Sequence, residues 1–218
     1  MAAPAVAFFL FTFPFVFFFA SVAADPDLLQ DVCAADYSFE AKLNGYACKK
    51  DIVVDDFVSD VIAKPGSPAN SYGSVATAAN VLKVPGLNTL GISMSRIDYA
   101  PGGLNPPHLH PRASEIIFVL EGELDVGFLT TNNTLIAKTV KRGEIFIFPK
   151  ALVHYQKNNA NAPASVLAAF NSQLPGTQVM ATTLFAAKPE VPDRILSETF
   201  HVGSKEIQKI KSRFAPKQ

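Results

Sequence analysis

The feature that most constrains the fold is a series of short apolar runs, rich in β-branched and aromatic residues, that begins near Leu90. Turn-forming polar and glycine residues separate successive runs, for example at 121–123, 130–134 and 141–144. Many short strands at such spacing are typical of an all-β sandwich or barrel. The runs predicted to form strands are 90–99, 115–120, 124–129, 134–140, 144–149, 152–156, 165–170 and 179–185.

The segments on either side of these runs follow other patterns. Residues 51–79, rich in Ser, Ala, Gly and Pro, are expected to form a long surface excursion before the barrel. At the C-terminal end, 193–200 and 203–214 have apolar residues at helical spacing, with Ile207, Ile210 and Phe214 on one stripe. Two short helices are predicted there, and their apolar stripe must be buried on the barrel or on a neighbouring subunit.

The N-terminal residues 1–24 contain no Asp, Glu, Lys or Arg and end in small residues, which is typical of a secretory signal cleaved near Ala23 or Ala24. A retained membrane anchor is the alternative, because the apolar run is long enough to span a bilayer and no Lys or Arg precedes it. Pro4 and Pro14 suit a spanning helix poorly and favour the signal. The remaining residues, 25–218, are enough for a single domain.

The inferred secretion bears on two further features. Cys33 and Cys48 are the only cysteines, and an oxidising compartment would join them in one disulfide worth about 3 kcal/mol; two buried free thiols are the alternative. Asn132, in the polar turn Asn132-Asn133-Thr134, is a candidate N-glycosylation site.

The charge balance excludes some classes of partner. The chain has 19 basic and 19 acidic residues, so its formal net charge is zero. A neutral chain without basic patches predicts no nucleic-acid partner. Once the signal is removed, nothing in the sequence predicts a membrane partner either.

The stretch "PGGLNPPHLHPRASE", residues 101–115, suggests a metal site. An isolated His-x-His is weak, because two surface histidines in a proline-rich loop would look the same. On an extended backbone, however, His108 and His110 point to the same side. Glu115 has the opposite parity, and a bend at Pro111 can return it to that side. His154 begins a later predicted strand and can join them, whereas His201 lies in the helical segment.

In these stretches the sequence resembles the germins and germin-like proteins of plants, within the cupin superfamily. The similarity runs from "LLQDVCAAD" and "NGYACK" through "PGLNTLGISMSRIDYAPGGLNPPHLHPRASE" and "GEIFIFPKALVHYQKN" to "FNSQLPGTQV" and the C-terminal helices. It contains two cupin motifs, residues 102–122 and 143–158, here called the first and the second motif. The resemblance implies a cupin β-barrel of the jelly-roll type with short C-terminal helices.

The resemblance also implies a metal and an assembly. In that family the corresponding side chains bind manganese, so His108, His110, Glu115 and His154 would hold Mn²⁺. The Cys33–Cys48 pair would match the family disulfide. The protein would be secreted to the apoplast or cell wall as a homohexamer, a trimer of dimers joined in part by the C-terminal helices.

Two positions depart from the family pattern. Ala151 replaces the usual glycine of the second motif, which strains the turn if its φ is positive. Ser95 stands where the cereal germins that oxidise oxalate have an asparagine, although the second such residue, Asn105, is retained. Oxalate oxidation is therefore not expected.

The leading functional prediction is a manganese superoxide dismutase acting on small anions. Three neutral imidazoles and one carboxylate leave a divalent ion with one net positive charge and with open coordination positions. Superoxide is a small anion that needs few binding groups, and germin-like relatives are described as dismutases. The alternative is an apoplastic protein without catalysis, such as a receptor-like, storage or auxin-binding cupin.

Overall fold

The computed structural model of the chain describes residues 31–40 and 45–214. The chain divides into two compact units, Met1–Asp31 and Val32–Gln218, and only Asp31 of the first unit is described. The predicted signal segment, 1–24, therefore lies outside the described residues. Among the residues that are described, no helix is both long enough and apolar enough to cross a membrane.

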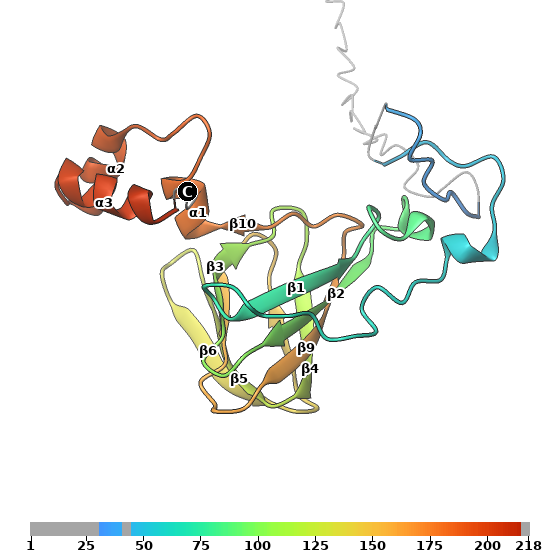
Figure 1. Ribbon diagram of the computed structural model, residues 1–218, viewed down its shortest axis with the longest axis horizontal. Coiled ribbons are helices and arrows are strands. Elements are labelled where there is room, and N and C mark those ends of the chain that lie inside the picture. The colour runs from blue at the N-terminus through green and yellow to red at the C-terminus, as the bar shows by residue number, and fades with distance from the viewer. Residues whose placement is uncertain (1–30, 41–44, 215–218) are drawn as a thin grey trace, which may run out of the picture. The chain divides into compact units, whose positions relative to one another are not determined.

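Two five-stranded antiparallel sheets form the body of the domain (Figure 1). The first sheet contains, in spatial order, β1 (Ser74–Ala79), β2 (Ser93–Tyr99), β9 (Ala164–Phe170), β4 (Glu115–Glu121) and β7 (Ile145–Phe148). The second contains β10 (Gln178–Val179), β3 (Leu104–Leu109), β8 (His154–Lys157), β5 (Glu123–Leu129) and β6 (Leu135–Lys141). Short 3-10 turns at Val54–Asp56 (η1) and Pro85–Leu87 (η2) precede β2.

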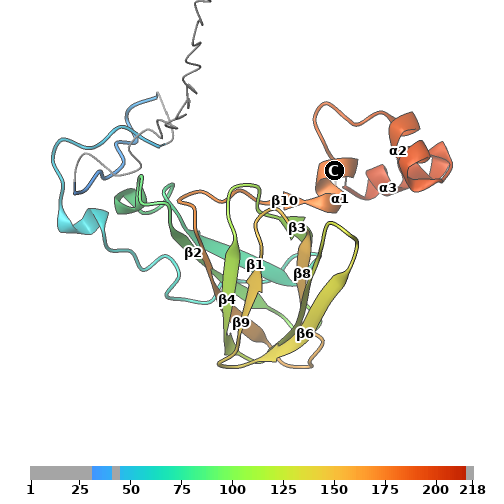
Figure 2. The same cartoon turned by 180° about the vertical axis from the view of Figure 1, so that it is seen from behind.

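The core lies between the two sheets, which face each other in both views (Figures 1 and 2). Alternate residues of strands such as β2 and β4 point into it, as the period of two in a β-strand requires. Ile117 and Val119 of β4 are fully buried, and so is Val126 of β5 in the opposite sheet. The all-β barrel predicted from the sequence is confirmed.

The predicted strands between residues 90 and 170 correspond to β2 and to β4 through β9. The strand predicted at 179–185 is wrong, because only Gln178–Val179 pairs with β3 and Met180–Phe185 forms the helix α1. Continued pairing would bring Met180 opposite Pro107, which has no N–H to donate. The ladder stops there, and the chain turns into a helix.

The surface excursion predicted for 51–79 extends too far, because its last residues belong to a strand. Its last residues, Ser74–Ala79, form β1 and pair with β2 along their whole length. The sequence "SVATAA" consists of small residues and lacks the alternation that marks the other strands. Pairing with a complete neighbour, rather than local propensity, makes this segment a strand.

The two predicted C-terminal helices are present as α2 (Asp193–Phe200) and α3 (Ser204–Phe214). The sequence predicted that the apolar stripe would be buried on the barrel or on a neighbouring subunit. Its residue Ile207 is instead fully buried within the chain itself, where α3 contacts α1 and α2. The ring of Phe214 stacks on Phe185 of α1 with centroids 6.4 Å apart. The helices thus cover one another.

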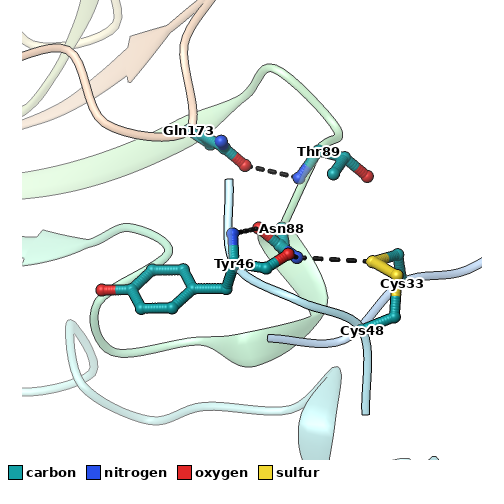
Figure 3. Close-up of a disulfide and its surroundings, with 6 residues drawn as sticks. All are labelled: Cys33, Tyr46, Cys48, Asn88, Thr89 and Gln173. Atoms are coloured by element: carbon teal, nitrogen blue, oxygen red, sulfur yellow. Dashed lines mark hydrogen bonds between the residues drawn. A yellow bond between two sulfur atoms is a disulfide. The ribbon is translucent and has the colours of Figure 1, made fainter. Parts of the chain in front are cut away.

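The N-terminal extension carries the disulfide between Cys33 and Cys48, so the predicted pairing is confirmed. Figure 3 shows that Asn88, just after η2, joins this extension to the barrel. Its Nδ2 donates to the carbonyl oxygen of Tyr46 at 2.8 Å, and its Oδ1 accepts from the Tyr46 N–H at 2.9 Å. The same Nδ2 lies 3.4 Å from Sγ of Cys33.

Candidate metal centre

Four buried side chains from both sheets converge inside the barrel. They are His108 of β3, His110 just after it, Glu115 at the start of β4 and His154 at the start of β8. One donor atom of each lies within 4.8 Å of the donor atoms of all the others. The structure therefore brings together the four residues that the sequence singled out, as a group that can hold a metal ion.

A β-bulge places the first motif in this interior. Between β3 and β8, Asn105 pairs with Gln156 and His108 pairs with His154, so β3 contains one residue more than its partner over this interval. Residues 105 and 108 have opposite parity and would face opposite sides of a regular strand. The extra residue reverses that relation, and both side chains line the same cavity. The prolines at 106 and 107, which donate no backbone hydrogen bond, occupy the irregular stretch.

Glu115 reaches the group because the chain changes sheets. The strand β3 ends at Leu109, the chain turns at 111–112, and β4 begins with Glu115 in the opposite sheet. The predicted bend after Pro111 is therefore present. Glu115 enters the cavity from the sheet that faces the histidines, which a straight strand would not allow.

Backbone carbonyls fix the tautomer of all three imidazoles. In His108 and His154, Nδ1 lies 2.8 Å from the carbonyl oxygen of the residue two positions earlier in the chain. In His110, Nδ1 lies 2.5 Å from the carbonyl oxygen of Gly176. A carbonyl oxygen only accepts hydrogen bonds, so each neutral ring carries its proton on Nδ1 and presents the lone pair of Nε2.

The converging lone pairs require a cation. Nε2 of His110 lies 2.9 Å from Oε2 of Glu115, and Nε2 of His154 lies 3.1 Å from the same oxygen. A neutral Nε2 repels a carboxylate oxygen at these distances, so a proton or a metal ion must lie between them. Three imidazoles and one carboxylate, oriented by hydrogen bonds on their far sides, are a donor set that fits a divalent transition metal.

Burial and the carboxylate set the protonation of the group. Burial lowers the pKa of His108 to about 4, and the neighbouring His154 adds to this effect. Burial acts in the same direction on His110, but the hydrogen bond and charge of Glu115 outweigh it and raise the pKa of His110. Burial opposes ionisation of Glu115, yet its hydrogen bonds and charge interactions with His110 and His154 lower its pKa to about 2. At neutral pH, Glu115 is therefore ionised and His108 is neutral.

A buried amide, Gln156, supports the carboxylate. Its Oε1 accepts hydrogen bonds from the Tyr99 hydroxyl at 2.6 Å and from Nδ2 of Asn105 at 2.9 Å. Its Nε2 donates to Oε1 of Glu115 at 3.3 Å. Because two donors occupy Oε1 of Gln156, its amide cannot turn round. One carboxylate oxygen of Glu115 is thereby held, and the other faces the imidazoles.

The group opens into a cavity of about 260 Å³. Ser95 and Asn105 both line it, so the structure places the two predicted substrate positions beside the four converging residues. Apolar side chains, among them Ile97, Phe170 and Leu174, form much of the remaining wall. Among the described residues, His108, His110 and Glu115 are the only ionisable side chains that line this cavity.

The structure gives the backbone conformation or exposure of three other positions that the sequence analysis singled out. Ala151 has φ +62°, so the strain expected from replacing the motif glycine is present in the turn before His154. Asn132 is exposed in the turn between β5 and β6, where a glycosyltransferase can reach it. His201 follows the last residue of α2, has φ +54° and is exposed. It is not part of the four-residue group.

Sequence reasoning missed two residues that orient the group. Gln156 lies two positions after His154 on an extended strand, and the shared parity was a signal that both face the interior. Gly176 gave no such signal, because it lies 66 residues from His110 in a stretch without regular structure.

Comparison with known proteins places these observations in context. Residues 61–208 match the family model described as Cupin. The chain is 63% identical over 198 residues to germin-like protein 5-1 of Oryza sativa subsp. japonica, covering 91% of this chain and 90% of that protein. It is 60% identical over 194 residues to the rhicadhesin receptor of Pisum sativum, covering 88% and 89%. A recombinant oxalate oxidase in complex with glycolate superposes with a TM-score of 0.84 at 41% identity, covering 88% of this chain and 98% of that one.

Proposed function

This chain belongs to the cupin family and, within it, to the germin-like proteins, and from that premise we propose that it is a secreted manganese superoxide dismutase of the plant cell wall. The observation that carries the proposal is the buried group of three imidazoles and one carboxylate beside a cavity. His108, His110 and His154 would hold the ion through Nε2, and Glu115 would hold it through Oε2. A bound manganese ion would supply a divalent–trivalent couple that oxidises one superoxide to oxygen and reduces the next, with two protons taken up from water, to hydrogen peroxide.

The protein itself contributes charge, access and orientation. One carboxylate against a divalent ion leaves one net positive charge, which attracts a monoanion. The cavity gives a small anion a path to that charge, and the described residues that line it include no Lys or Arg that would retain the anion. The tautomers fixed by backbone carbonyls keep each Nε2 free, so the site requires little reorganisation on binding a metal.

The same cavity argues against oxalate as the substrate. Oxalate carries two negative charges, and the described lining offers no cation besides the metal to balance the second. Of the amide pair in the oxalate-oxidising germins, only Asn105 remains, because Ser95 has a shorter hydroxyl side chain. Asn105 is also engaged, since its Nδ2 donates to Gln156. We expect superoxide consumption without oxalate oxidation.

The experiment is to assay metal-analysed protein from its native source with superoxide and oxalate side by side. His154→Ala should abolish both stoichiometric manganese and superoxide consumption. His201→Asn is the matched control, because it removes a histidine outside the group at a left-handed position that asparagine tolerates. Stoichiometric zinc without manganese, measured by elemental analysis and electron paramagnetic resonance, would exclude the redox function.

A receptor-like binding protein is the second candidate, because the rhicadhesin receptor of Pisum sativum is 60% identical to this chain. In that case the metal would support the barrel, and neither the wild type nor His154→Ala would consume superoxide. A storage or auxin-binding role would give the same result. The superoxide assay therefore separates catalysis from binding.

We also propose that the protein is a glycosylated homohexamer, a trimer of dimers. Support comes from an apolar strip on the outer face of the first sheet, where Ile116 pairs with Ile147 and Phe118 pairs with Ile145. These four side chains are between 39% and 56% exposed, and contiguous exposed apolar surface is typical of an interface. Light scattering would measure the subunit number, and mass spectrometry would detect a glycan on Asn132.

A further inference from the structure

The three imidazoles of the candidate metal centre are not oriented in the same way. His108 and His154 each donate from Nδ1 to a carbonyl of their own segment, two residues earlier. These hydrogen bonds persist wherever the local backbone keeps its conformation. His110 instead donates to the carbonyl of Gly176, in the segment 171–177 that follows β9. The orientation of His110 therefore depends on the position of a distant segment.

The segment 171–177 has no helix or strand of its own, and hydrogen bonds hold it beside residues 110–114. Nε of Arg112 donates to the carbonyl oxygen of Leu174 at 2.7 Å, and the Arg112 backbone N–H donates to that of Pro175 at 3.3 Å. Oδ1 of Asn171 accepts from the Ser114 N–H at 2.8 Å. Arg112 is thus bound to the two residues that directly precede Gly176 in this segment.

The guanidinium of Arg112 also lies against Gly176 itself. A Cβ on Gly176 would lie 2.8 Å from Nη2 of Arg112 and 3.1 Å from its Cζ. Gly176 has φ +70°, a conformation that favours glycine. The absence of a side chain therefore allows the guanidinium to pack on the backbone whose carbonyl holds His110.

We propose that Arg112 is a positioning residue for His110, acting through the carbonyl of Gly176. The inference rests on the metal site proposed above, but Arg112 itself is exposed and is not one of the four converging residues. By fixing segment 171–177, it keeps the Gly176 carbonyl where it accepts the Nδ1 proton of His110. Nε2 of His110 then stays unprotonated and directed at the metal position. The same segment lines the cavity, so Arg112 also holds one wall of the substrate path.

The test measures metal affinity by chelator competition for the wild type, Arg112→Ala and Arg112→Lys, using Mn²⁺ and Zn²⁺ as probes. Loss of a partner that orients a ligand lowers metal affinity by about 10- to 100-fold. We expect a loss of about that size in Arg112→Ala and a smaller loss in Arg112→Lys, which keeps the charge but not the planar guanidinium. Arg142→Ala is the matched control, because Arg142 is an exposed arginine in the turn before β7.

A second readout is independent of metal loading and activity. Nitrogen-15 NMR of the histidine side chains reports the tautomer of His110 in metal-free protein at a pH where the ring is neutral, and in the zinc form. The wild type should show a protected Nδ1 proton, and Arg112→Ala should show faster exchange of that proton. Gly176→Ala should produce the same change by displacing the carbonyl.

The outcomes separate this proposal from the proposed function. If Arg112→Ala lowers metal affinity while the wild type consumes no superoxide, the positioning role stands and the dismutase proposal fails. If neither protein binds metal, faster exchange of the His110 proton in Arg112→Ala supports the positioning role, and unchanged exchange overturns it. Metal affinity and His110 exchange in Arg112→Ala that match Arg142→Ala would also overturn it.

Discussion

The first and second cupin motifs contribute differently to the candidate metal centre. The first motif, 102–122, supplies three of the four converging side chains, yet its residue His110 is oriented from outside the motif by Gly176. The second motif, 143–158, supplies only His154, but its other residues form hydrogen bonds to His110 and Glu115 of the first motif. Its Ala151 N–H donates to the carbonyl of His110 at 3.2 Å.

The second motif continues this support beyond its histidine. Gln156 and Asn158 are both fully buried. Nδ2 of Asn158 donates to the carbonyl oxygens of Ala100 at 2.9 Å and Ala162 at 2.8 Å. It thereby joins the end of β2 to the segment that precedes β9. The first motif therefore supplies most of the metal-holding atoms, but it relies on Gly176 and on the second motif for part of their support.

The largest expected effect comes from Glu115→Gln, in the first motif. The substitution keeps the shape but removes the only negative charge of the group, so we expect metal affinity to fall by at least about 100-fold. Chelator competition measures the affinity, and circular dichroism confirms that the fold is retained. An affinity within about threefold of the wild type would mean that Glu115 does not hold the metal.

A smaller loss is expected from Gln156→Leu, in the second motif. It leaves Oε1 of Glu115 without its amide donor, so metal affinity should fall by about 10- to 100-fold. It also leaves the buried Tyr99 hydroxyl without the acceptor for its proton, which should lower the free energy of unfolding by about 1–3 kcal/mol. Tyr155→Phe, the next residue along β8, is the control. If metal affinity fell as far as in Glu115→Gln, the distinction between a residue that holds the metal and one that holds Glu115 would fail.

Acidification should release the metal through the first motif. The pKa of His110 is raised, so as the pH falls this imidazole takes up a proton before His108, whose pKa is about 4. One competing proton lowers metal affinity by about tenfold per pH unit. In metal-free protein the sign reverses, because the stability from protonated His110 is present at low pH and is lost as the pH rises through its raised pKa.

Chelator titrations between pH 8 and pH 5 measure this slope. A slope near one proton supports His110 as the group that controls release. Two or more protons displaced from neutral pH downward would contradict the separate behaviour of His108 and His110.

The smallest effect should come from Ala151→Gly, which relieves the positive φ in the second motif. We expect the free energy of unfolding to rise by about 1 kcal/mol. Ala137→Gly, at an exposed position of β6 without a positive φ, should lower it by a similar amount. Thermal melts of both variants decide the matter, and destabilisation by Ala151→Gly would mean that the turn carries no strain.

Much of the barrel could be predicted because most of its strands carry a local pattern. In β4, for instance, Glu115, Ile117 and Val119 are buried while Ile116 and Phe118 are exposed, which reflects the period of the strand. The strand β1 could not be found this way, because its small residues alternate little and its pairing with β2 makes it a strand. The helix α1 was missed because the end of its strand pairing depends on Pro107 of a different strand.

The residue types of the metal group and the turn positions could be identified from the sequence alone, whereas the positive φ of Ala151 became known only from the structure. Only the tertiary structure decided that Gly176, 66 residues from His110, would orient that ring, and that Gln156 would link Glu115 to Asn105. Such contacts depend on the register between strands and on the bulge in β3. The physical reason is that hydrogen bonds between distant segments follow from how the sheets pair, and no local pattern encodes that geometry.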